Sequence, residues 1–183
     1  MPNTQTIIAQ TKIWLSSIVI AHNICPFAKR EFDSGRIHYE VIETSETQRQ
    51  LEQLIAQCAA LDKDAARETS LLIFPSSLSD YGDYLDFLAL ATALLKTQDY
   101  EGIYQLASFH PDYQFAETPP DDASHYTNRS PYPMLHILRE ASVEAALKHY
   151  PNPEGIPERN IALMQEMGVE VMRGLLAACY ESS

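Results

Sequence analysis

Three short apolar segments, separated by longer segments with helical periodicity, constrain the fold of this chain more than any other feature. Residues 36–43 alternate apolar and polar side chains, the pattern of a strand with one buried face. Residues 69–74 and 103–109 are short apolar runs, and the first of them ends at Pro75. The order strand–helix–strand–helix–strand favours crossover connections and therefore parallel strands.

The helical segments complete a prediction of the fold class. Apolar residues recur at helical spacing in five segments, at about residues 4–22, 45–61, 80–101, 133–149 and 158–180. Ser45 followed by Gln48 has the spacing of a capping box. We predict an α/β fold with a small three-stranded, mostly parallel sheet flanked by about five helices. The alternative is a ferredoxin-like α+β fold with a fourth strand.

The length and charge of the chain exclude several classes of protein. Its 183 residues are enough for one domain (1–183) with a sizeable core, and two domains would be cramped. The 25 acidic residues outnumber the 13 basic ones, giving a net charge of −12. This excess argues against nucleic acid and anionic membranes as partners. The acids concentrate between Glu68 and Asn128, and the charge changes sign at Arg129.

The cysteines and the apolar segments indicate a reduced cytoplasmic setting. Cys25, Cys58 and Cys179 are odd in number and widely spaced, so they form no disulfide or zinc-ribbon pattern. Residues 13–21 are too short to span a bilayer and lack a signal-peptide cleavage pattern. The methionines of the last helical segment belong to the core or to a dimer face, so a homo-oligomer is possible.

Residues 110–131 form an unusually long segment without periodicity. Loops of this length are uncommon inside compact domains and are usually functional or disordered. Several aromatic residues in it could pack, which argues against disorder. The segment also follows the carboxyl end of a predicted strand, where open α/β sheets place their ligands. We therefore expect the functional site here.

Three motifs in the chain resemble those of a known family. They are HNICPFAKR (His22–Arg30), YQLASFHPDYQF (Tyr104–Phe115) and NRSPYPMLHILREASVE (Asn128–Glu144). Together they resemble an uncharacterised bacterial family, domain of unknown function 1415, over essentially the whole chain. The resemblance implies no activity or cofactor, and it directs attention to the residues of these motifs.

Cys25 is the first candidate catalytic residue. It precedes Pro26 at an expected helix start, where free N–H groups and the helix dipole favour a thiolate. The alternative is a small buried core residue. His110, followed by Asp112, is a candidate general base for the Cys25 nucleophile. His136 is the third candidate catalytic residue.

A metal site is an alternative use of the same residues. His22 and Cys25 have a His-x-x-Cys spacing that could supply two ligands to a divalent transition metal such as zinc. His110 or His136 would complete the set. The competing interpretation of His22 is a helix C-cap.

The segment Asn128–Arg129–Ser130 is a candidate anion-binding site. It leads into the helix expected from residue 133, whose free N–H groups, with a serine hydroxyl and an arginine, suit phosphate or carboxylate. Arg139 would lie on the same helix as His136. The alternative is a solvated helix face of little energetic weight.

These candidates lead to three functional hypotheses. The first is a small enzyme that acts on an anionic metabolite through Cys25, His110 and His136, with the anion held by Asn128, Arg129, Ser130 and Arg139. The second is a non-catalytic metal- or thiol-binding protein. The third is an interaction module whose aromatic loop is exposed and binds a protein partner.

Overall fold

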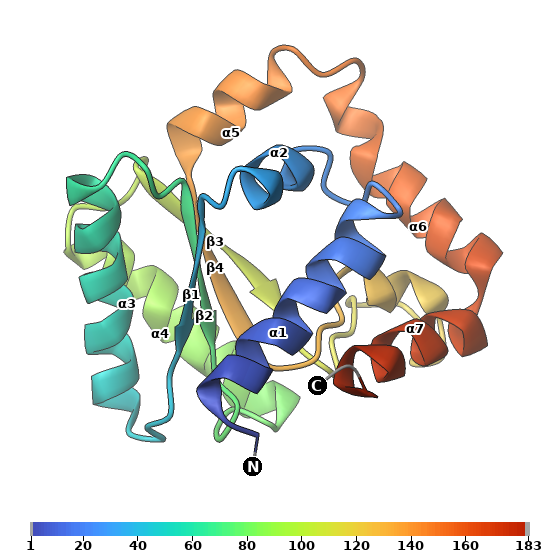
Figure 1. Ribbon diagram of the computed structural model, residues 1–183, viewed down its shortest axis with the longest axis horizontal. Coiled ribbons are helices and arrows are strands. Elements are labelled where there is room, and N and C mark those ends of the chain that lie inside the picture. Colours follow the sequence, from blue (N-terminus) through green and yellow to red (C-terminus); the bar gives the residue numbers. More distant parts are fainter. Residues whose placement is uncertain (1, 182–183) are drawn as a thin grey trace.

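A four-stranded mixed sheet forms the centre of the protein, as the computed structural model shows for residues 2–181 (Figure 1). The strands are ordered β1-β2-β4-β3. They are β1 (Ile37–Val41), β2 (Thr69–Ile73), β3 (Tyr104–Phe109) and β4 (Met134–Arg139). The helices are α1 (Thr4–Trp14), the π-helix η1 (Leu15–Ile20), α2 (Ala28–Asp33), α3 (Thr47–Lys63), α4 (Tyr81–Thr97), the 3₁₀ turn η2 (Ala123–Thr127), α5 (Glu140–Leu147), the 3₁₀ turn η3 (Pro153–Gly155), α6 (Ile156–Met167) and α7 (Val169–Glu181).

The predicted α/β class is confirmed, but the prediction of three strands is wrong. Strands β1 and β2 pair in parallel, and both β2 and β3 pair antiparallel with β4. The first three strands therefore run in one direction, with β4 reversed between β2 and β3. Residues 134–139, which were expected at the start of a helix over 133–149, form this strand, and only Glu140–Leu147 is helical.

The order of the four strands distinguishes this topology from the ferredoxin-like alternative. In a ferredoxin-like fold, the two strands of each βαβ unit are separated by another strand. Here β1 and β2, joined by α3, are direct neighbours, whereas β2 and β3, joined by α4, are separated by β4. The two strands of the β1–α3–β2 unit are therefore neighbours in the sheet, whereas the two strands of the β2–α4–β3 unit are separated by β4.

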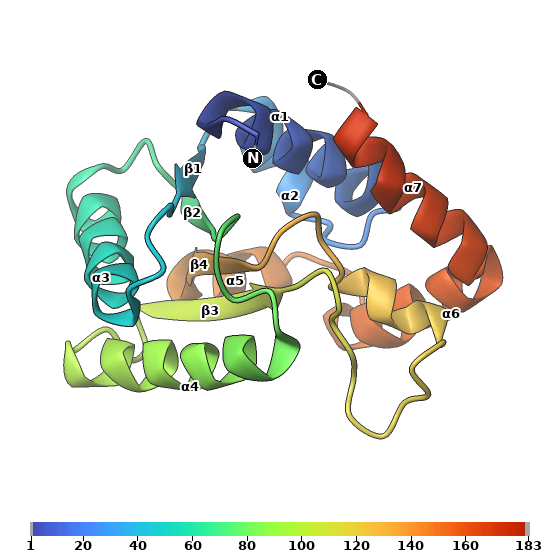
Figure 2. The same cartoon turned by 90° about the horizontal axis from the view of Figure 1, so that it is seen from below.

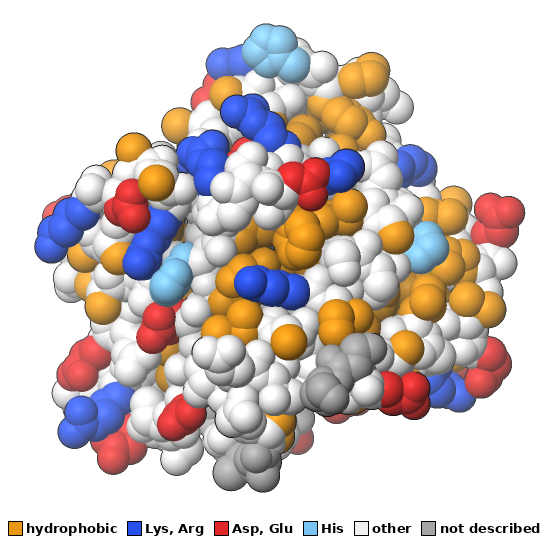
Figure 3. Space-filling view, in the orientation of Figure 1, with side chains coloured by type: hydrophobic (Ala, Val, Ile, Leu, Met, Phe, Trp, Pro, Cys, Tyr) orange, Lys and Arg blue, Asp and Glu red, His pale blue; other side chains and the backbone are white. Residues whose placement is uncertain are grey.

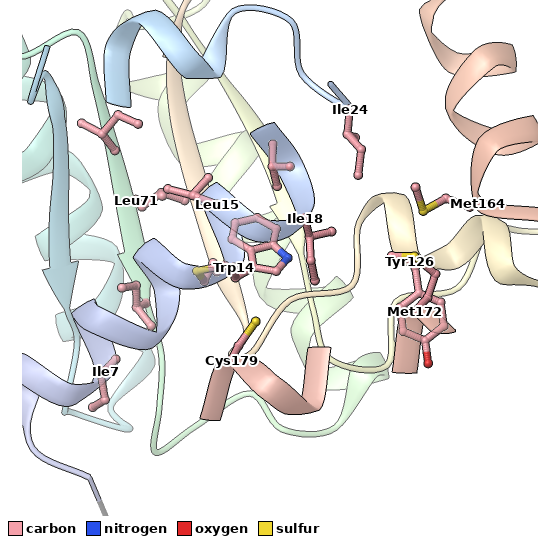
Figure 4. Close-up of a cluster of buried hydrophobic side chains, with 14 of the residues drawn as sticks. Ile7, Trp14, Leu15, Ile18, Ile24, Leu71, Tyr126, Met164, Met172 and Cys179 are labelled. Atoms are coloured by element: carbon pink, nitrogen blue, oxygen red, sulfur yellow. The ribbon is translucent and has the colours of Figure 1, made fainter. Parts of the chain in front are cut away.

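Helices cover the two faces of the sheet and bury a separate hydrophobic cluster on each. On the side that we call the α1 face, residues of α1, η1, α6 and α7 pack against the strands (Figures 2 and 4). On the other side, the α4 face, α3 and α4 cover the sheet. The largest fully buried side chains on the two faces are Trp14 and Tyr84, which are 1% and 0% exposed. Because central β4 contributes to both clusters, it is apolar on both sides.

The helix boundaries follow local sequence signals. The side chain of Asn3 accepts a hydrogen bond from the Thr6 N–H (2.9 Å) and caps α1. The expected helix over 158–180 is divided by Gly168, whose φ of +82° ends α6 and separates it from α7.

None of the helices within residues 2–181 has the length and apolar composition needed to cross a bilayer. On the face shown in Figure 3, basic and acidic side chains are interspersed.

Candidate functional site

Cys25 lies in the turn between η1 and α2, and the residue is exposed. Helix α2 is only six residues long and begins three positions later, at Ala28. Despite the exposure of the residue as a whole, partial desolvation of the thiol raises its pKa, and the N–H groups of Phe27 and Ala28 offset only part of this effect. The pKa is therefore shifted opposite to the direction predicted for a reactive thiolate.

The surroundings of Cys25 come from α6 and from the segment that follows α5. Asn160 donates from Nδ2 to the carbonyl oxygen of Ile24 (2.8 Å), and Arg159 donates to the carbonyl oxygen of Asn23. The ring of Phe27 packs edge-on against Tyr150, with 5.7 Å between the ring centroids. A small hollow of about 190 Å³ adjoins this corner, lined by Tyr150, Pro151, Asn152, Gly155, Ile156 and Arg159.

His110 is fully buried at the end of β3, and both of its ring nitrogens bind the backbone. The N–H of Asp112 donates to Nδ1 (3.0 Å), so Nε2 carries the proton and donates to the carbonyl oxygen of Leu78 (2.9 Å). Burial lowers the pKa of His110, which keeps the ring neutral. These bonds connect the start of the long loop to the segment before α4, and they leave no nitrogen free to act as a base toward Cys25.

His125 repeats the arrangement of His110 within the same long loop. Its Nδ1 accepts from the Phe115 N–H (3.1 Å), and Nε2 donates to the carbonyl oxygen of Pro119 (2.8 Å). The ring is fully buried. The role of His125 could not be predicted, since nothing in the local sequence distinguishes a histidine that binds backbone from one that binds a ligand. Residues 110–131 are therefore held in place by two buried imidazoles.

The aromatic residues of the long loop pack into a column with these histidines. Ring centroids lie 5.1 Å apart for Tyr81 and His110, 5.8 Å for Tyr81 and Tyr113, and 5.1 Å for Tyr113 and Phe115. The aromatic residues in and beside this loop are all buried or half-buried, namely Phe109, Tyr113, Phe115, Tyr126 and Tyr132. This packing argues against the interaction-module hypothesis.

The predicted metal ligands are not assembled into a site. Within residues 2–181, no three histidine, cysteine, aspartate or glutamate side chains are grouped so that they could hold a metal ion. His22 and Cys25 belong to the corner beside α6, while His110 is bound to Leu78 and packed on Tyr81. The divalent-metal hypothesis gains no support from this arrangement.

His136 lies in the middle of β4 on the α1 face, opposite Leu71 of β2 and Ala107 of β3. The hydroxyl of Thr69 donates to the Ile137 carbonyl oxygen (2.5 Å), so it accepts from His136 Nε2–H (2.5 Å). These two hydrogen bonds fix the tautomer of His136 and leave the lone pair of its Nδ1 open. Burial lowers the pKa of His136 to about 4, so the ring is neutral at pH 7.

The predicted anion-binding segment has no helix behind it, because β4 replaces the expected helix. The side chains of Asn128 and Ser130 bind backbone carbonyl oxygens, of Ser108 (3.1 Å) and Tyr132 (2.6 Å) respectively. Arg129 donates from Nε to the carbonyl oxygen of Tyr113 (3.2 Å), and its guanidinium lies over the Tyr126 ring. The helix dipole that motivated this prediction is therefore absent here.

Arg139 lies at the far end of β4 from Arg129. Its guanidinium donates to the carbonyl oxygens of Leu61 (2.6 Å) and Arg67 (3.1 Å) and to the hydroxyl of Tyr104 (3.3 Å). The length of the strand alone separates the two arginines by roughly 17 Å. Arg129 and Arg139 thus do not form one anion seat.

A groove of about 350 Å³ opens where the chain leaves the carboxyl ends of β1 and β2. Its polar residues are Ser45, Thr47, Gln50, Ser77, Asp83 and Asp86, and its apolar residues are Leu78, Phe87 and Leu90. The groove therefore lies between the amino-terminal halves of α3 and α4. This is the edge at which open α/β sheets bind ligands.

The groove combines a fixed polar floor with unpaired charge. Gln50 is buried and donates from Nε2 to the Thr44 carbonyl oxygen (2.9 Å) and to the Ser77 hydroxyl (2.7 Å). Neither Asp83 nor Asp86 forms an ion pair within the described part of the chain. Ser45, which was expected to cap α3, does not do so, because the helix begins after Glu46.

A family model described as a protein of unknown function (DUF1415) matches residues 6–174. The chain is a member of the DUF1415 family. Comparison with curated proteins and with solved structures found no match. In this DUF1415 protein, the three sequence motifs supply the corner around Cys25, the buried His110, and β4 with His136, while the groove is built from other segments.

Proposed function

We propose that this DUF1415 protein binds a small molecule in the groove at the carboxyl ends of β1 and β2. The proposal rests on one observation, a groove of about 350 Å³ into which two carboxylates project without an ion-pair partner. Ligand sites in proteins typically enclose roughly 300–1,000 Å³ and combine apolar walls with a few placed polar groups. The groove falls at the lower end of this range.

The chemistry of the lining selects the class of ligand. Asp83 and Asp86 attract an ammonium or guanidinium group, and the hydroxyls of Ser45 and Thr47 add hydrogen-bonding positions on the opposite wall. Phe87 and Leu90 provide an apolar surface for a carbon skeleton. The ligand that fits is an amine of metabolite size with hydroxyl groups or a short hydrocarbon part. The two carboxylates of the lining favour the approach of cations.

A thermal-shift screen with matched amines and carboxylates tests this proposal. Primary amines, diamines and amino sugars are expected to raise the unfolding temperature of the protein, and their carboxylate counterparts are not. The double variant Asp83→Asn/Asp86→Asn should lose this protection. The control Glu117→Gln/Asp121→Asn removes two exposed loop carboxylates outside the groove and should keep it. If both double variants respond alike, or only carboxylates protect, the groove does not bind amines.

A second candidate function is catalysis on an anionic metabolite at the α1 face. The observation that favours it is the open Nδ1 lone pair of His136, which Thr69 holds in one tautomer. His136 would accept a proton, the thiol of Cys25 would act as the nucleophile, and the terminal nitrogens of Arg129 would bind a carboxylate or phosphate. A substrate screen with phosphorylated and carboxylated metabolites tests this function. Turnover that survives in both His136→Asn and Cys25→Ser would exclude it.

A further inference from the structure

Gln50 is a buried side chain whose amide is fixed in one orientation. It is 1% exposed, and its Nε2 donates to the Thr44 carbonyl oxygen (2.9 Å) and to the Ser77 hydroxyl (2.7 Å). A carbonyl oxygen only accepts hydrogen bonds, so exchanging the two ends of the amide would set Oε1 against another acceptor. The hydrogen bonds of the amide nitrogen therefore also determine where Oε1 lies.

The amide oxygen of Gln50 opens to the groove without a hydrogen-bond partner. Within residues 2–181, both hydrogen bonds of this side chain are made by Nε2. In the same part of the chain, Glu31 Oε2 is the only completely buried side-chain oxygen or nitrogen that lacks a partner. Gln50 Oε1 therefore keeps some accessible surface, and the cavity that Gln50 lines is the groove.

The hydroxyl of Ser77 lies near this oxygen, lines the same groove and has an unused hydrogen. Because Ser77 Oγ accepts from Gln50, its own hydrogen points elsewhere, and the described residues provide no acceptor for it. The nitrogen and oxygen of an amide are about 2.3 Å apart, so Ser77 Oγ and Gln50 Oε1 are separated by no more than about 5 Å. One ligand atom can therefore bind both groups.

We propose that Gln50 and Ser77 bind a hydroxyl group of the ligand, which makes that ligand an amino alcohol or an amino sugar. With a single oxygen, a hydroxyl donates to Gln50 Oε1 and accepts from Ser77, whereas an ether cannot donate and an ammonium group cannot accept. The inference rests on the proposed function, since Asp83 and Asp86 hold the ammonium group of the same molecule.

The loop that carries Ser77 is held from two sides before any ligand arrives. Gln50 connects it to the Thr44 carbonyl oxygen, and His110 donates to the carbonyl oxygen of the next residue, Leu78 (2.9 Å). Leu78 has a φ of +58°, which is uncommon for residues other than glycine. A fixed donor and a fixed acceptor discriminate strongly, because an analogue without the hydroxyl leaves both of them unpaired.

Calorimetric titration with matched ligands tests this inference. The probes are short amino alcohols, the alkylamines of the same length, and the methyl ethers of the alcohols. The wild-type protein should bind an amino alcohol at least about ten-fold more tightly than either analogue. Equal affinities for alcohols and alkylamines at every chain length would overturn the inference, because water would then satisfy Gln50 and Ser77 as well as the ligand does.

Two serine variants locate the source of the preference for the alcohol. Ser77→Ala should reduce this preference at least several-fold. Ser79→Ala is the matched control, because Ser79 is an exposed serine of the same loop outside the groove, and it should keep the preference. Circular dichroism establishes that both variants are folded. An equal preference in both variants, or one lost in Ser45→Ala instead, contradicts the assignment to Ser77 and Gln50.

The Asp83→Asn/Asp86→Asn variant separates this inference from the proposed function. Loss of affinity for alcohols and alkylamines alike in that variant supports the amine site, whichever residues bind the hydroxyl. Amine binding without a preference that depends on Ser77 overturns the inference alone. A wild-type protein that binds neither alcohols nor alkylamines overturns both.

Discussion

His110 and His125 each hold an imidazole ring between a backbone N–H and a backbone carbonyl oxygen. In His110, protonation of Nδ1 would place an N–H against the Asp112 N–H from which that nitrogen now accepts a hydrogen bond. Loss of either ring would remove one hydrogen-bond partner from a backbone N–H and one from a backbone carbonyl oxygen. These two residues therefore act as fixed internal supports for residues 110–131. Both ring nitrogens of each histidine are occupied by hydrogen bonds to the backbone.

We predict that His110→Ala and His125→Ala each destabilise the fold by about 2–4 kcal/mol, since each leaves a cavity in place of a buried ring and removes two hydrogen bonds to the backbone. Urea unfolding followed by circular dichroism measures the change. His149→Ala is the control, because His149 is exposed and should change stability by less than about 0.5 kcal/mol. Equal effects of all three substitutions would show that the two buried rings are not supports.

The low pKa of His136 predicts a loss of stability in mild acid. Its pKa is about 4 in the folded chain against an ordinary value of 6.5, so below pH 6.5 the unfolded chain binds more protons than the folded chain. The stabilising effect of the neutral ring is complete above pH 6.5 and declines as the pH falls. Between pH 7 and pH 5.5 we expect the free energy of unfolding to fall by about 1 kcal/mol for this residue.

The variant His136→Leu isolates this contribution. Unfolding free energies at pH 7 and pH 5.5 should differ by about 1 kcal/mol less in the variant than in the wild type. His110, whose pKa is also lowered, still titrates in the variant. An unchanged difference would show that His136 is not the group responsible.

At the scale of elements, the strands β1, β2 and β3 could be predicted from the sequence, but β4 could not. In β4, Met134, His136 and Leu138 face one cluster, and Leu135, Ile137 and Arg139 face the other. A central strand buried on both faces lacks the alternation of apolar and polar residues. Its residue types also favour helix, and α5 follows at once, so only the long-range pairing with β2 and β3 specifies a strand.

The boundary between α6 and α7 yields a prediction at the same scale. Gly168 has φ +82° and ψ 157°, a backbone conformation essentially restricted to glycine. Gly168→Ala should therefore destabilise the protein by about 1–3 kcal/mol. The control is Gly174→Ala in the interior of α7, where an added Cβ meets nothing within 4 Å, and it should stabilise by about 0.5–1 kcal/mol. Relative to the wild type, the unfolding temperature should therefore fall in Gly168→Ala and rise in Gly174→Ala.

At the scale of the whole molecule, the two hydrophobic clusters share one sheet. We predict that Leu54→Ala, on the α4 face, destabilises the protein by about 2–5 kcal/mol and lowers the urea midpoint reported by Trp14 on the opposite face. Trp14 is the only tryptophan and is buried, so its fluorescence reports the α1 face alone. A Trp14 transition that stays in place while the far-ultraviolet dichroism shifts would show two independent units.

The candidate groove could not be predicted from the sequence, because only the folded chain brings its residues together. Its residues come from three separate segments, 45–50, 77–78 and 83–90, none of which carries a recognisable ligand-binding motif. The one usable signal was that Ser45 and Ser77 follow predicted strands at the edge where α/β sheets bind ligands. The sequence did predict an exceptional loop at 110–131, but it could not show that backbone groups within that loop would occupy His110 and His125.

The position of β4 between β2 and β3 also dictates an order of assembly during synthesis. Strand β2 leaves the ribosome with β1 beside it, yet its other edge has no neighbour until residues 134–139 emerge, more than sixty residues later. For that interval the nascent chain exposes an apolar strand edge of the kind that recruits other chains. Efficient production of this protein should therefore depend on chaperone supply and elongation rate between β2 and β4 more than on the stability of the finished fold.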